Sequence, residues 1–529
     1  MKKITIRKFI ATLGASALIV GGTLTLIPSA NAADPIVETT TGKLANGATY
    51  LMKVPARFNG TFFIWNHGFR PSFPYPSYTV PTGVEELTPY SVNLKADVTA
   101  QMLKAGYGVA SYDRVSTGGL HGWNTTDGVE MLKDMVDTAH AKYTTIKKVV
   151  VYGSSGAAPV INQFIEKYPD KADAVGLMAG LTTPSAAIQS LCDYFYLLSV
   201  FADPTIKGCA AFGVAKGVAG HMAALGEFAK AGALLTAWSK DLGSLPLAYP
   251  APLATSGIPQ RSALLLSGLI VGLPTKSAHM DGISTSAVIA EQSINATVAI
   301  LENSQDALGT GTLAGQAIGE ITGPGFYDNT KTDWSALLSA ADSGRYNLGL
   351  SGDDAIAGML GVLKMMPRVK GDPAAVAKFK ALDKINYTSD KPTILLSNEA
   401  DRLVFAGNSA LYVDNARASY KARLAKYKAG TGTKPVWNTL ALYALTPETY
   451  TKYTDKGLPD FTAAPAVSGV GHQSFTEAQM MGWVKLLAQS AKTGKAPSQK
   501  FVGSAIFAKI DPNLNTDPDF LPNLLKYKS

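Results

Sequence analysis

Short apolar runs alternate with segments of helical spacing between about residue 60 and residue 180. Four of these runs are rich in β-branched or aromatic residues and predict buried strands at 61–65, 107–112, 149–152 and 174–180. Helices are predicted between them at 96–105 and 129–143, where apolar residues recur every three or four positions. Alternating strands and helices predict a parallel sheet with helices on both of its faces.

The alternation stops after residue 183 and returns at residue 392. The stretch between is rich in Ala, Gly, Leu and Ser, with helical runs at 221–238 and 355–366 and no convincing strand. We interpret residues 185–390 as a mainly helical cap inserted into an α/β core. That core is formed by residues 33–184 and by residues 391–529, which include a C-terminal tail.

The returning pattern predicts a strand at 392–397 and a helix that runs through Ala425. The stretch 426–461 contains Gly, Thr, Pro and Tyr throughout and has no readable period. We expect the last strand of the core at 464–467 and a closing helix at 476–491.

The first 32 residues have the pattern of a cleavable secretory signal. Four basic residues precede an apolar run from residue 9 to about residue 27, and Ala30-Asn31-Ala32 supplies small residues for cleavage near Ala32. A membrane anchor is the alternative, but Gly, Ser and Thr dilute the apolar run. We therefore expect a secreted or extracytoplasmic protein with no stable membrane anchor after cleavage.

Charge and cysteine content narrow the classes of function. The formal net charge of +8 falls to +4 when the four basic residues of the signal are removed, and the remaining lysines form no stripe interleaved with aromatics. This distribution predicts no nucleic-acid partner. The only two cysteines, Cys192 and Cys209, are 17 positions apart, and in an exported chain such a pair favours a local disulfide over a metal site.

The strand at 149–152 turns into a helix through Gly153-Ser154-Ser155-Gly156-Ala157. A nucleophile at such a turn needs small neighbours, because its backbone is strained and the helix passes close to the strand. Gly153 and Ala157 lie two positions either side of Ser155, which makes Ser155 the predicted nucleophile. Centring the turn on Ser154 would put Tyr152 where a small residue is needed. An ordinary glycine-containing turn remains the alternative for this pentapeptide alone.

A serine hydroxyl needs a base to remove its proton and an acid to orient that base. Among the six histidines, only His472 lies in a loop after the last predicted strand, next to a glycine and downstream of the candidate acid. That acid is Asp401, which follows the strand at 392–397, with Glu399 as the alternative. Both carboxylates could instead be ordinary loop residues or helix caps.

Acyl transfer also needs hydrogen-bond donors for the oxyanion. The backbone N–H of Gly156, directly after the nucleophile, is one candidate. The strand at 61–65 leads into His67-Gly68-Phe69, and we predict the backbone N–H of Phe69 as the second donor. His67 could orient this loop or only satisfy a buried turn. Asp113-Arg114, after the strand at 107–112, is interpreted as a structural network that holds the loops.

These motifs together resemble those of the α/β-hydrolase family. His67-Gly68-Phe69 resembles its oxyanion loop, and residues 153–157 resemble its G-x-S-x-G elbow, with Ala157 in the place of the last glycine. Residues 398–404 resemble the acid motif G-x-x-D-x-x-V, with Asn398 replacing the glycine, and this register selects Asp401. Gly471-His472 resembles the histidine loop, and the order Ser, Asp, His is the order of the family.

The resemblance covers roughly residues 45–185 and 390–492 and implies an α/β-hydrolase fold with a cap. It implies a serine hydrolase that cleaves carboxylic esters through an acyl-enzyme formed on Ser155, with His472 as the base and Asp401 as the acid. The expected partner is a small-molecule ester or peptide-like substrate, and no metal or organic cofactor is expected. A secreted aminopeptidase of the same fold, like a proline iminopeptidase or a tripeptidyl aminopeptidase, is the alternative. It would need an acidic residue in the cap to hold an amino terminus, and the sequence offers Asp193, Asp203 and Asp281. A non-catalytic binding protein on a hydrolase scaffold is a third interpretation. The sequence leaves the oligomeric state open.

Overall fold

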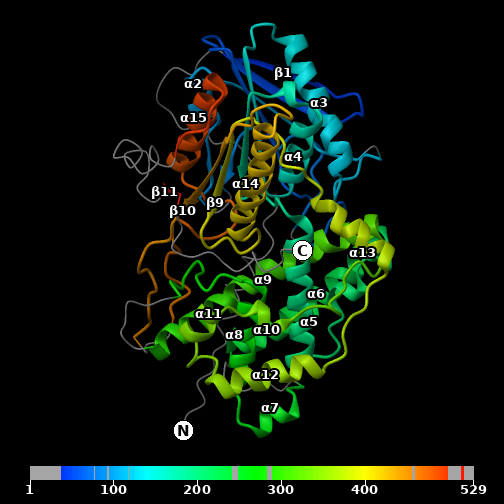
Figure 1. Ribbon diagram of the computed structural model, residues 1–529, viewed down its shortest axis with the longest axis vertical. Helices are drawn as coiled ribbons and strands as arrows, with labels where there is room; N and C mark the ends of the chain where they lie inside the picture. Colours follow the sequence, from blue (N-terminus) through cyan, green and yellow to red (C-terminus); the bar gives the residue numbers. More distant parts are fainter. Residues whose placement is uncertain are drawn as a thin grey trace.

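The computed structural model describes residues 37–76, 78–91, 94–116, 118–240, 248–282, 289–455, 459–466, 468–498 and 514–516. The predicted signal peptide, residues 1–32, lies outside these ranges. Figure 1 shows the sheet with its flanking helices in the upper half and a group of helices below it. No helix of the described ranges is both long and apolar enough to cross a membrane.

A nine-stranded sheet forms the core, and its order in space is β1-β2-β6-β3-β7-β8-β9-β10-β11. The strands are β1 (Val37–Lys43), β2 (Thr49–Pro55), β3 (Thr61–Asn66), β6 (Gly108–Tyr112), β7 (Lys148–Ser154), β8 (Ala174–Met178), β9 (Thr393–Asn398), β10 (Thr439–Ala444) and β11 (Leu514–Asn515). All pairs from β6 to β10 are parallel, whereas β1, β2 and β11 pair antiparallel with their neighbours. The predicted parallel sheet is confirmed. A separate two-stranded sheet consists of β4 (Tyr90–Ser91) and β5 (Ala96–Asp97).

Helices cover both faces of this sheet. One face packs against α3 (Thr125–Lys142), α4 (Ala158–Lys167) and α14 (Gly407–Lys428), and the other against α2 (Thr99–Lys104) and α15 (Glu477–Thr493). Alternate side chains of β7 enter the two cores: Val149 and Val151 the first, Val150 and Tyr152 the second. Burial on both sides explains why this strand is a continuous apolar run in the sequence.

The cap lies between β8 and β9 in the sequence and has a hydrophobic core of its own. The helices α5 and α9 contribute Leu197 and Ile300 to this core, and α8 contributes Leu265. The cap helices are α5 (Pro184–Phe201), α6 (Gly217–Lys240), α7 (Ala251–Thr255), α8 (Gln260–Val271), α9 (Ile289–Thr322), α10 (Trp334–Leu337), α11 (Ala340–Arg345), α12 (Asp353–Met365) and α13 (Pro373–Lys380). Short 3-10 helices are η1 (Ser155–Ala157), η2 (Pro169–Lys171), η3 (Gly208–Ala211) and η4 (Ala381–Asp383). Within the described ranges, the cap contains no strand, as predicted.

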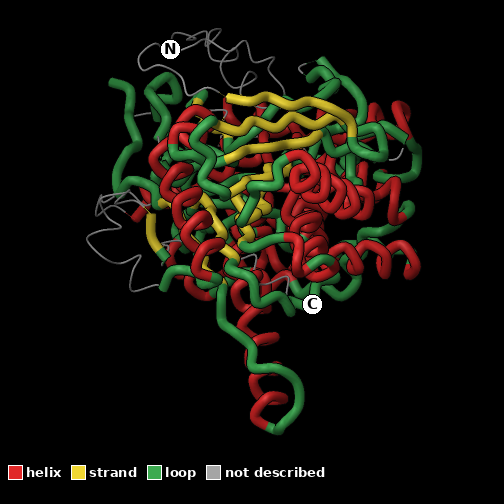
Figure 2. Tube along the Cα trace, turned by 90° about the horizontal axis from the view of Figure 1, so that it is seen from above, coloured by secondary structure: helices red, strands yellow, loops and turns green. Residues whose placement is uncertain are grey.

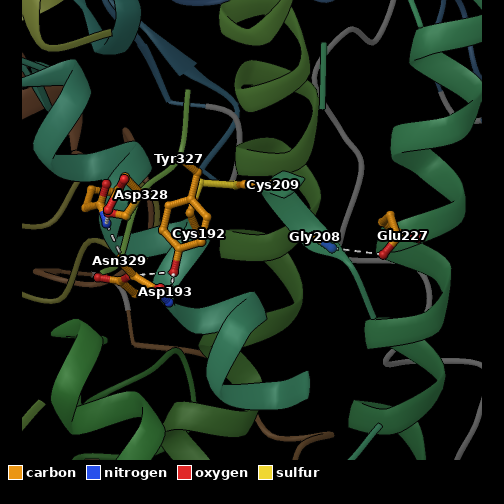
Figure 3. Close-up of a disulfide and its surroundings, with 9 residues drawn as sticks. Cys192, Asp193, Gly208, Cys209, Glu227, Tyr327, Asp328 and Asn329 are labelled. Carbon is orange, nitrogen blue, oxygen red and sulfur yellow. Dashed lines mark hydrogen bonds between the residues drawn. A yellow bond between two sulfur atoms is a disulfide. The ribbon is translucent and has the colours of Figure 1, made fainter. Parts of the chain in front are cut away.

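The predicted disulfide is present at the start of the cap. Cys192 of α5 is bonded to Cys209 of η3, with the two Cα atoms 5.3 Å apart (Figure 3). The Glu227 side chain of α6 accepts a hydrogen bond from the backbone N–H of Gly208 at 2.9 Å (Figure 3). The segment that contains Gly208 and Cys209 is therefore attached to α5 by the disulfide and to α6 by this hydrogen bond. Next to Cys192, the carboxylate of Asp193 accepts a hydrogen bond from the hydroxyl of Tyr327 at 2.7 Å.

Two predictions of secondary structure are wrong. The segment 96–105 is not one helix, because it begins as β5 and becomes helical only from Thr99. The last strand of the core before the histidine loop is β10 and not 464–467, of which residues 464–466 are described and form no strand. The backbone N–H of Ala466 donates instead to Ala278 of the cap at 2.8 Å. A tertiary contact with the cap thus takes the hydrogen bond that a strand would need.

Candidate active site

The turn after β7 has the backbone of a nucleophile elbow. Ser155 has a φ of 52°, which is the left-handed region that residues other than glycine rarely adopt. A Cβ on Gly153 would lie 2.5 Å from the carbonyl oxygen of Asn66, so only glycine fits where β7 passes β3. The same Cβ would lie 2.9 Å from the Ala157 methyl group, which already fills the space between strand and helix.

The two serines of the elbow face different surroundings. Ser154 is the last residue of β7, fully buried, and its hydroxyl has no hydrogen-bond partner among the described residues. Ser155 is partly exposed and lines a cavity between core and cap. Of the two sequence candidates, only Ser155 can therefore meet a ligand in this cavity.

The loop after β3 lies directly against Ser155. A Cβ on Gly68 would be 3.1 Å from the Cβ of Ser155, and a Cβ on Gly156 would be 3.0 Å from the backbone nitrogen of Phe69. The backbone nitrogen of Phe69, one predicted oxyanion donor, thus lies against Gly156, the residue that carries the other. In the part of the chain that the structure describes, the Phe69 N–H has no acceptor. It is available to a ligand.

His67 holds this loop as a neutral imidazole. Its Nε2 accepts a hydrogen bond from the backbone N–H of Arg114 at 2.8 Å, so the proton is on Nδ1, which donates to the Gly68 carbonyl oxygen at 2.8 Å. Arg114 Nη2 donates to the same carbonyl at 3.0 Å. Burial, together with the positive charges of Arg70 and Arg114, holds the pKa of His67 well below its ordinary value. The imidazole therefore stays uncharged, as both hydrogen bonds require.

A buried carboxylate completes the network behind the loop. Asp113 accepts hydrogen bonds from Arg70 Nη1 at 3.0 Å and from His121 Nε2 at 2.7 Å. Burial lowers the pKa of Arg114 to about 10, so its guanidinium is still charged at neutral pH. The prediction that Asp113-Arg114 belongs to a structural network is confirmed by these contacts.

Asp401 and His472 are joined at the carboxyl ends of the strands. The Nδ1 of His472 donates to Oδ2 of Asp401 at 2.9 Å. The other carboxylate oxygen accepts from the backbone N–H groups of Leu403 at 2.8 Å and Val404 at 3.0 Å, and Asp401 is fully buried. These bonds fix the carboxylate, and with Nδ1 as the donor, the lone pair of His472 is on Nε2.

Glu399, the alternative acid, has a different role. Its Oε2 accepts hydrogen bonds from the backbone N–H of Thr446 at 3.0 Å and from its hydroxyl at 2.9 Å. Lys276 of the cap lies 3.6 Å from the same oxygen. Glu399 is thus a buried link between core and cap and does not contact His472.

The loops that carry Asp401 and His472 are paired through their backbones. The N–H of Ala400 donates to the carbonyl of Gly469 at 2.8 Å, and the N–H of Gly471 donates to the carbonyl of Ala400 at 3.1 Å. Asn398 Nδ2 also donates to the carbonyl of Gly471 at 2.8 Å. Gly469 has a φ of 72°, and a Cβ there would lie 2.3 Å from the backbone nitrogen of Thr446, so the crossing requires glycine. This pairing sets the position of the imidazole relative to the acid.

Gln473 lies between the histidine and the serine. Its Nε2 is 3.2 Å from Nε2 of His472 and 3.6 Å from the place where a Cβ on Gly68 would stand, next to Ser155. No hydrogen bond joins Ser155 to His472 among those of the described residues, and the Gln473 amide donates to the imidazole lone pair instead. Gln473 also has a left-handed backbone, with a φ of 55°. Its position directly after the histidine is the only signal of it in the sequence.

The cavity above Ser155 is small and apolar. Its volume is about 70 Å³, and helices α5, α8 and α9 of the cap form most of its wall, with side chains such as Ile188 and Val271. Among the described residues, Arg402 is the one charged residue that lines it, and its guanidinium is paired with Asp306 of α9. Burial raises the pKa of Asp306, although Arg402 opposes this change. No group of three or more His, Cys, Asp or Glu residues within the described ranges could hold a metal ion.

Comparisons with known proteins add little beyond the fold. No protein-family model matches the chain, and no curated protein matches it in sequence. Among solved structures, feruloyl esterase B from Aspergillus oryzae is 10% identical, with 88% of this chain and 85% of that chain covered and a TM-score of 0.33. An esterase from the same fungus is 13% identical, with 87% and 80% covered and a TM-score of 0.30. An alpha/beta hydrolase fold protein from Nakamurella multipartita is 11% identical, with 77% and 90% covered and a TM-score of 0.26.

At such low TM-scores these likenesses carry no weight for the activity, and the assignment rests on the molecule itself. The mostly parallel sheet has an antiparallel β2, the elbow follows β7, and the acid and histidine loops follow β9 and β10 in the order Ser, Asp, His. By this sheet, these loops and their order, the chain has an α/β-hydrolase fold.

Proposed function

We propose that the protein is a secreted serine hydrolase that cleaves carboxylic esters with an apolar acyl or alcohol group. One observation carries the proposal. Ser155 has a left-handed backbone at the wall of an apolar cavity, with the free N–H of Phe69 beside it and the Asp401–His472 pair at the same edge of the sheet. The export rests on the signal pattern of residues 1–32.

In this proposal, Ser155 Oγ attacks the ester carbonyl carbon while Nε2 of His472 takes its proton. The negative charge that develops on the carbonyl oxygen is stabilised by the backbone N–H groups of Phe69 and Gly156. Asp401 remains ionised and holds the Nδ1–H, which stabilises the imidazolium. His472 then protonates the leaving alcohol and later removes a proton from the water that cleaves the acyl-enzyme.

The Gln473 amide must leave Nε2 of His472 before the base can accept the proton of Ser155. Hydrogen bonds of catalytic groups are often long or misaligned before substrate binds and tighten in the complex. Because the donor is a neutral amide on a flexible side chain, a rotation of Gln473 is sufficient to free the lone pair.

The lining of the cavity favours esters over peptides with a free amino terminus. An aminopeptidase would need a carboxylate to hold the substrate ammonium group, but the described residues that line the cavity include no Asp or Glu, and the guanidinium of Arg402 is paired with Asp306. Asp193 and Asp281 are buried and accept hydrogen bonds from Tyr327 and from the Tyr450 backbone, respectively. Neither these residues nor Asp203 line the cavity.

The size of the cavity limits the group that fits without movement of the cap. A volume of about 70 Å³ is about half that of the apolar cavity of about 150 Å³ that binds benzene. We therefore expect short acyl groups to be cleaved fastest and the rate to fall as the chain lengthens.

The test is labelling with a fluorophosphonate probe, with the adduct located by mass spectrometry. We expect label on Ser155, no label in the Ser155→Ala variant, and full labelling of Ser154→Ala. Ser154 is the matched control, because it is the adjacent serine and its buried hydroxyl has no partner among the described residues. Unchanged labelling of Ser155→Ala would refute the proposal.

A panel of p-nitrophenyl esters and aminoacyl p-nitroanilides then tests the substrate class. Turnover of the esters without turnover of the anilides is the expected result. Turnover of the anilides alone would replace the esterase with the aminopeptidase. Absence of both labelling and turnover would favour a binding protein on a hydrolase scaffold.

A further inference from the structure

One helix and the loop after it stand away from the body of the molecule (Figure 2). The burial pattern identifies this feature as the end of α14, the helix at the front of the sheet in Figure 1, and the loop that follows. All ten residues from 425 to 434 are exposed, although residues 425–428 are helical. We call residues 421–434 the basic finger.

The basic finger contains no buried residue. A helix in a globular protein usually buries one apolar stripe, which provides most of its stability. The side chains of α14 that enter the core, Leu411, Tyr412 and Ala416, lie in its first half. Beyond Lys421 the residues are exposed or half-buried, so the finger extends past the part that the fold requires.

The charged residues of the finger and of the chain on either side of it are all basic. No acidic residue occurs between positions 415 and 447, while six basic residues do. Two of the six are engaged: Arg423 pairs with Asp390 at 2.9 Å, and Arg417 lies over the Trp437 ring. The described ranges contain no ion pair for the remaining four, which are Lys421, Lys426, Lys428 and Lys434.

The spacing of these cations fits an extended anion. Lys421 and Lys428 are seven residues apart, which is about 10 Å along a helix and places them on one side. Lys426 lies on another side, and Lys434 is in the returning loop. Four exposed ammonium groups around a projecting rod can be contacted together by a flexible chain that carries repeated negative charges.

We infer that the basic finger binds a linear anionic polysaccharide. A bilayer is disfavoured, because this helix has no apolar face to enter the lipid. A single-stranded nucleic acid is disfavoured, because successive bases stack on several aromatic rings, whereas the finger exposes the ring of Tyr427 alone and Tyr420 before it packs edge-on against Trp437. A carboxylated sugar polymer needs only the cations.

The finger is separate from the candidate active site. Phe405 lines the cavity, α14 begins two residues later, and a helix of 22 residues spans about 33 Å. Polymer binding at the finger would therefore hold the protein on a polyanionic matrix without occupying the cavity. The inference does not depend on the proposed esterase activity.

The test is affinity electrophoresis of the full mature chain in gels that contain polygalacturonate. The finger variant replaces Lys421, Lys426, Lys428 and Lys434 with Gln. The matched control replaces four exposed cap lysines, Lys364, Lys370, Lys378 and Lys380, with Gln and so changes the net charge equally. We expect retardation of the native protein and a dissociation constant about tenfold higher for the finger variant, since exposed charge pairs are individually weak.

The control variant should bind within about twofold of the native protein. Both variants should keep the native melting temperature, because the replaced side chains are exposed. Salt at about 0.5 M should abolish retardation, because the Debye length is then well below 10 Å.

If both variants bind polygalacturonate more weakly by the same factor, only net charge matters and the inference is overturned. Binding of the finger variant as tight as that of the native protein would also overturn it. Vesicles with phosphatidylglycerol and a single-stranded oligonucleotide serve as competing probes. Finger-dependent capture of either one, without retardation by polygalacturonate, would assign a different partner. Labelling of Ser155 by the fluorophosphonate should be equal in all three proteins, so a failure here is distinguishable from a failure of the proposed activity.

Discussion

Replacement of Asp401 by Asn tests whether the acid acts through the tautomer of His472. In the native site, Oδ1 accepts two backbone N–H bonds, from Leu403 and Val404, and Oδ2 accepts the Nδ1–H of His472. An Asn side chain keeps the two backbone bonds only if its oxygen takes the Oδ1 place. Its NH₂ group then points at Nδ1 of His472, which must become an acceptor.

The proton of the imidazole is then on Nε2, where the proposed reaction needs a lone pair. A wrong tautomer in an otherwise intact Ser-His-Asp site lowers kcat by about 10⁴-fold, which corresponds to about 5.5 kcal/mol of lost transition-state stabilisation. We expect a loss of this size for Asp401→Asn, measured as kcat on a short p-nitrophenyl ester, with a nearly unchanged melting temperature.

Glu399→Gln is the matched control, because it removes the same charge from a buried carboxylate two residues away that does not contact His472. It should keep kcat within about tenfold of the native value, since only the link to the cap changes. If folded Asp401→Asn keeps kcat within about tenfold as well, or if both variants lose activity equally, the tautomer reasoning is refuted.

Three further outcomes follow from other contacts. The Cys192→Ala/Cys209→Ala double variant should unfold with about 3 kcal/mol less free energy in a urea titration, given the separation of 17 residues, and an unchanged midpoint would contradict this. The pKa of His67 in the folded protein is below its ordinary value of 6.5, so the unfolded state binds more protons near and below this pH. The free energy of unfolding should therefore fall as the pH drops below 6.5 toward the folded pKa, by up to about 1.4 kcal/mol per pH unit. His67→Gln should reduce this slope in urea titrations from pH 7 to 5, and equal slopes would rule out His67 as its source. Gln473→Ala should speed fluorophosphonate labelling about fivefold, because one hydrogen bond of about 1 kcal/mol no longer occupies Nε2 of His472, and slower labelling would mean that the amide assists the reaction.

Local pattern was sufficient for the parallel strands β3, β6, β7, β8 and β9 and for the order of the candidate site residues along the chain. Residues 149–152 are apolar on both sides of the strand, and such a run predicts burial between two layers of helices wherever it occurs. The elbow was readable as well, because the crossing of β7, β3 and α4 leaves room only for small residues, and Gly153 and Ala157 record this constraint in the sequence.

The positions of side chains within the site needed the tertiary structure. The sequence presents Glu399 and Asp401 as two similar loop carboxylates, and the backbone pairing of Ala400 with residues 469 and 471 brings only Asp401 to His472. Gln473 shows the same dependence, because its contact with the imidazole arises from a left-handed backbone that no local pattern predicts.

The strand β10 shows where the local sequence pattern is no longer sufficient and tertiary contacts decide the structure. Its six residues lie in a stretch without a readable period, and the sequence predicted the last strand at 464–467 instead. Which of them joins the sheet depends on partners: β10 has a parallel neighbour in β9, whereas Ala466 donates its N–H to the cap. The sequence by itself thus determined the fold class, the elbow and the chain order of serine, acid and histidine, because each depends on local period and residue size. Only the tertiary structure decided which carboxylate meets the imidazole, what lines the cavity and where the cations of α14 project, because these depend on contacts between residues far apart in the chain.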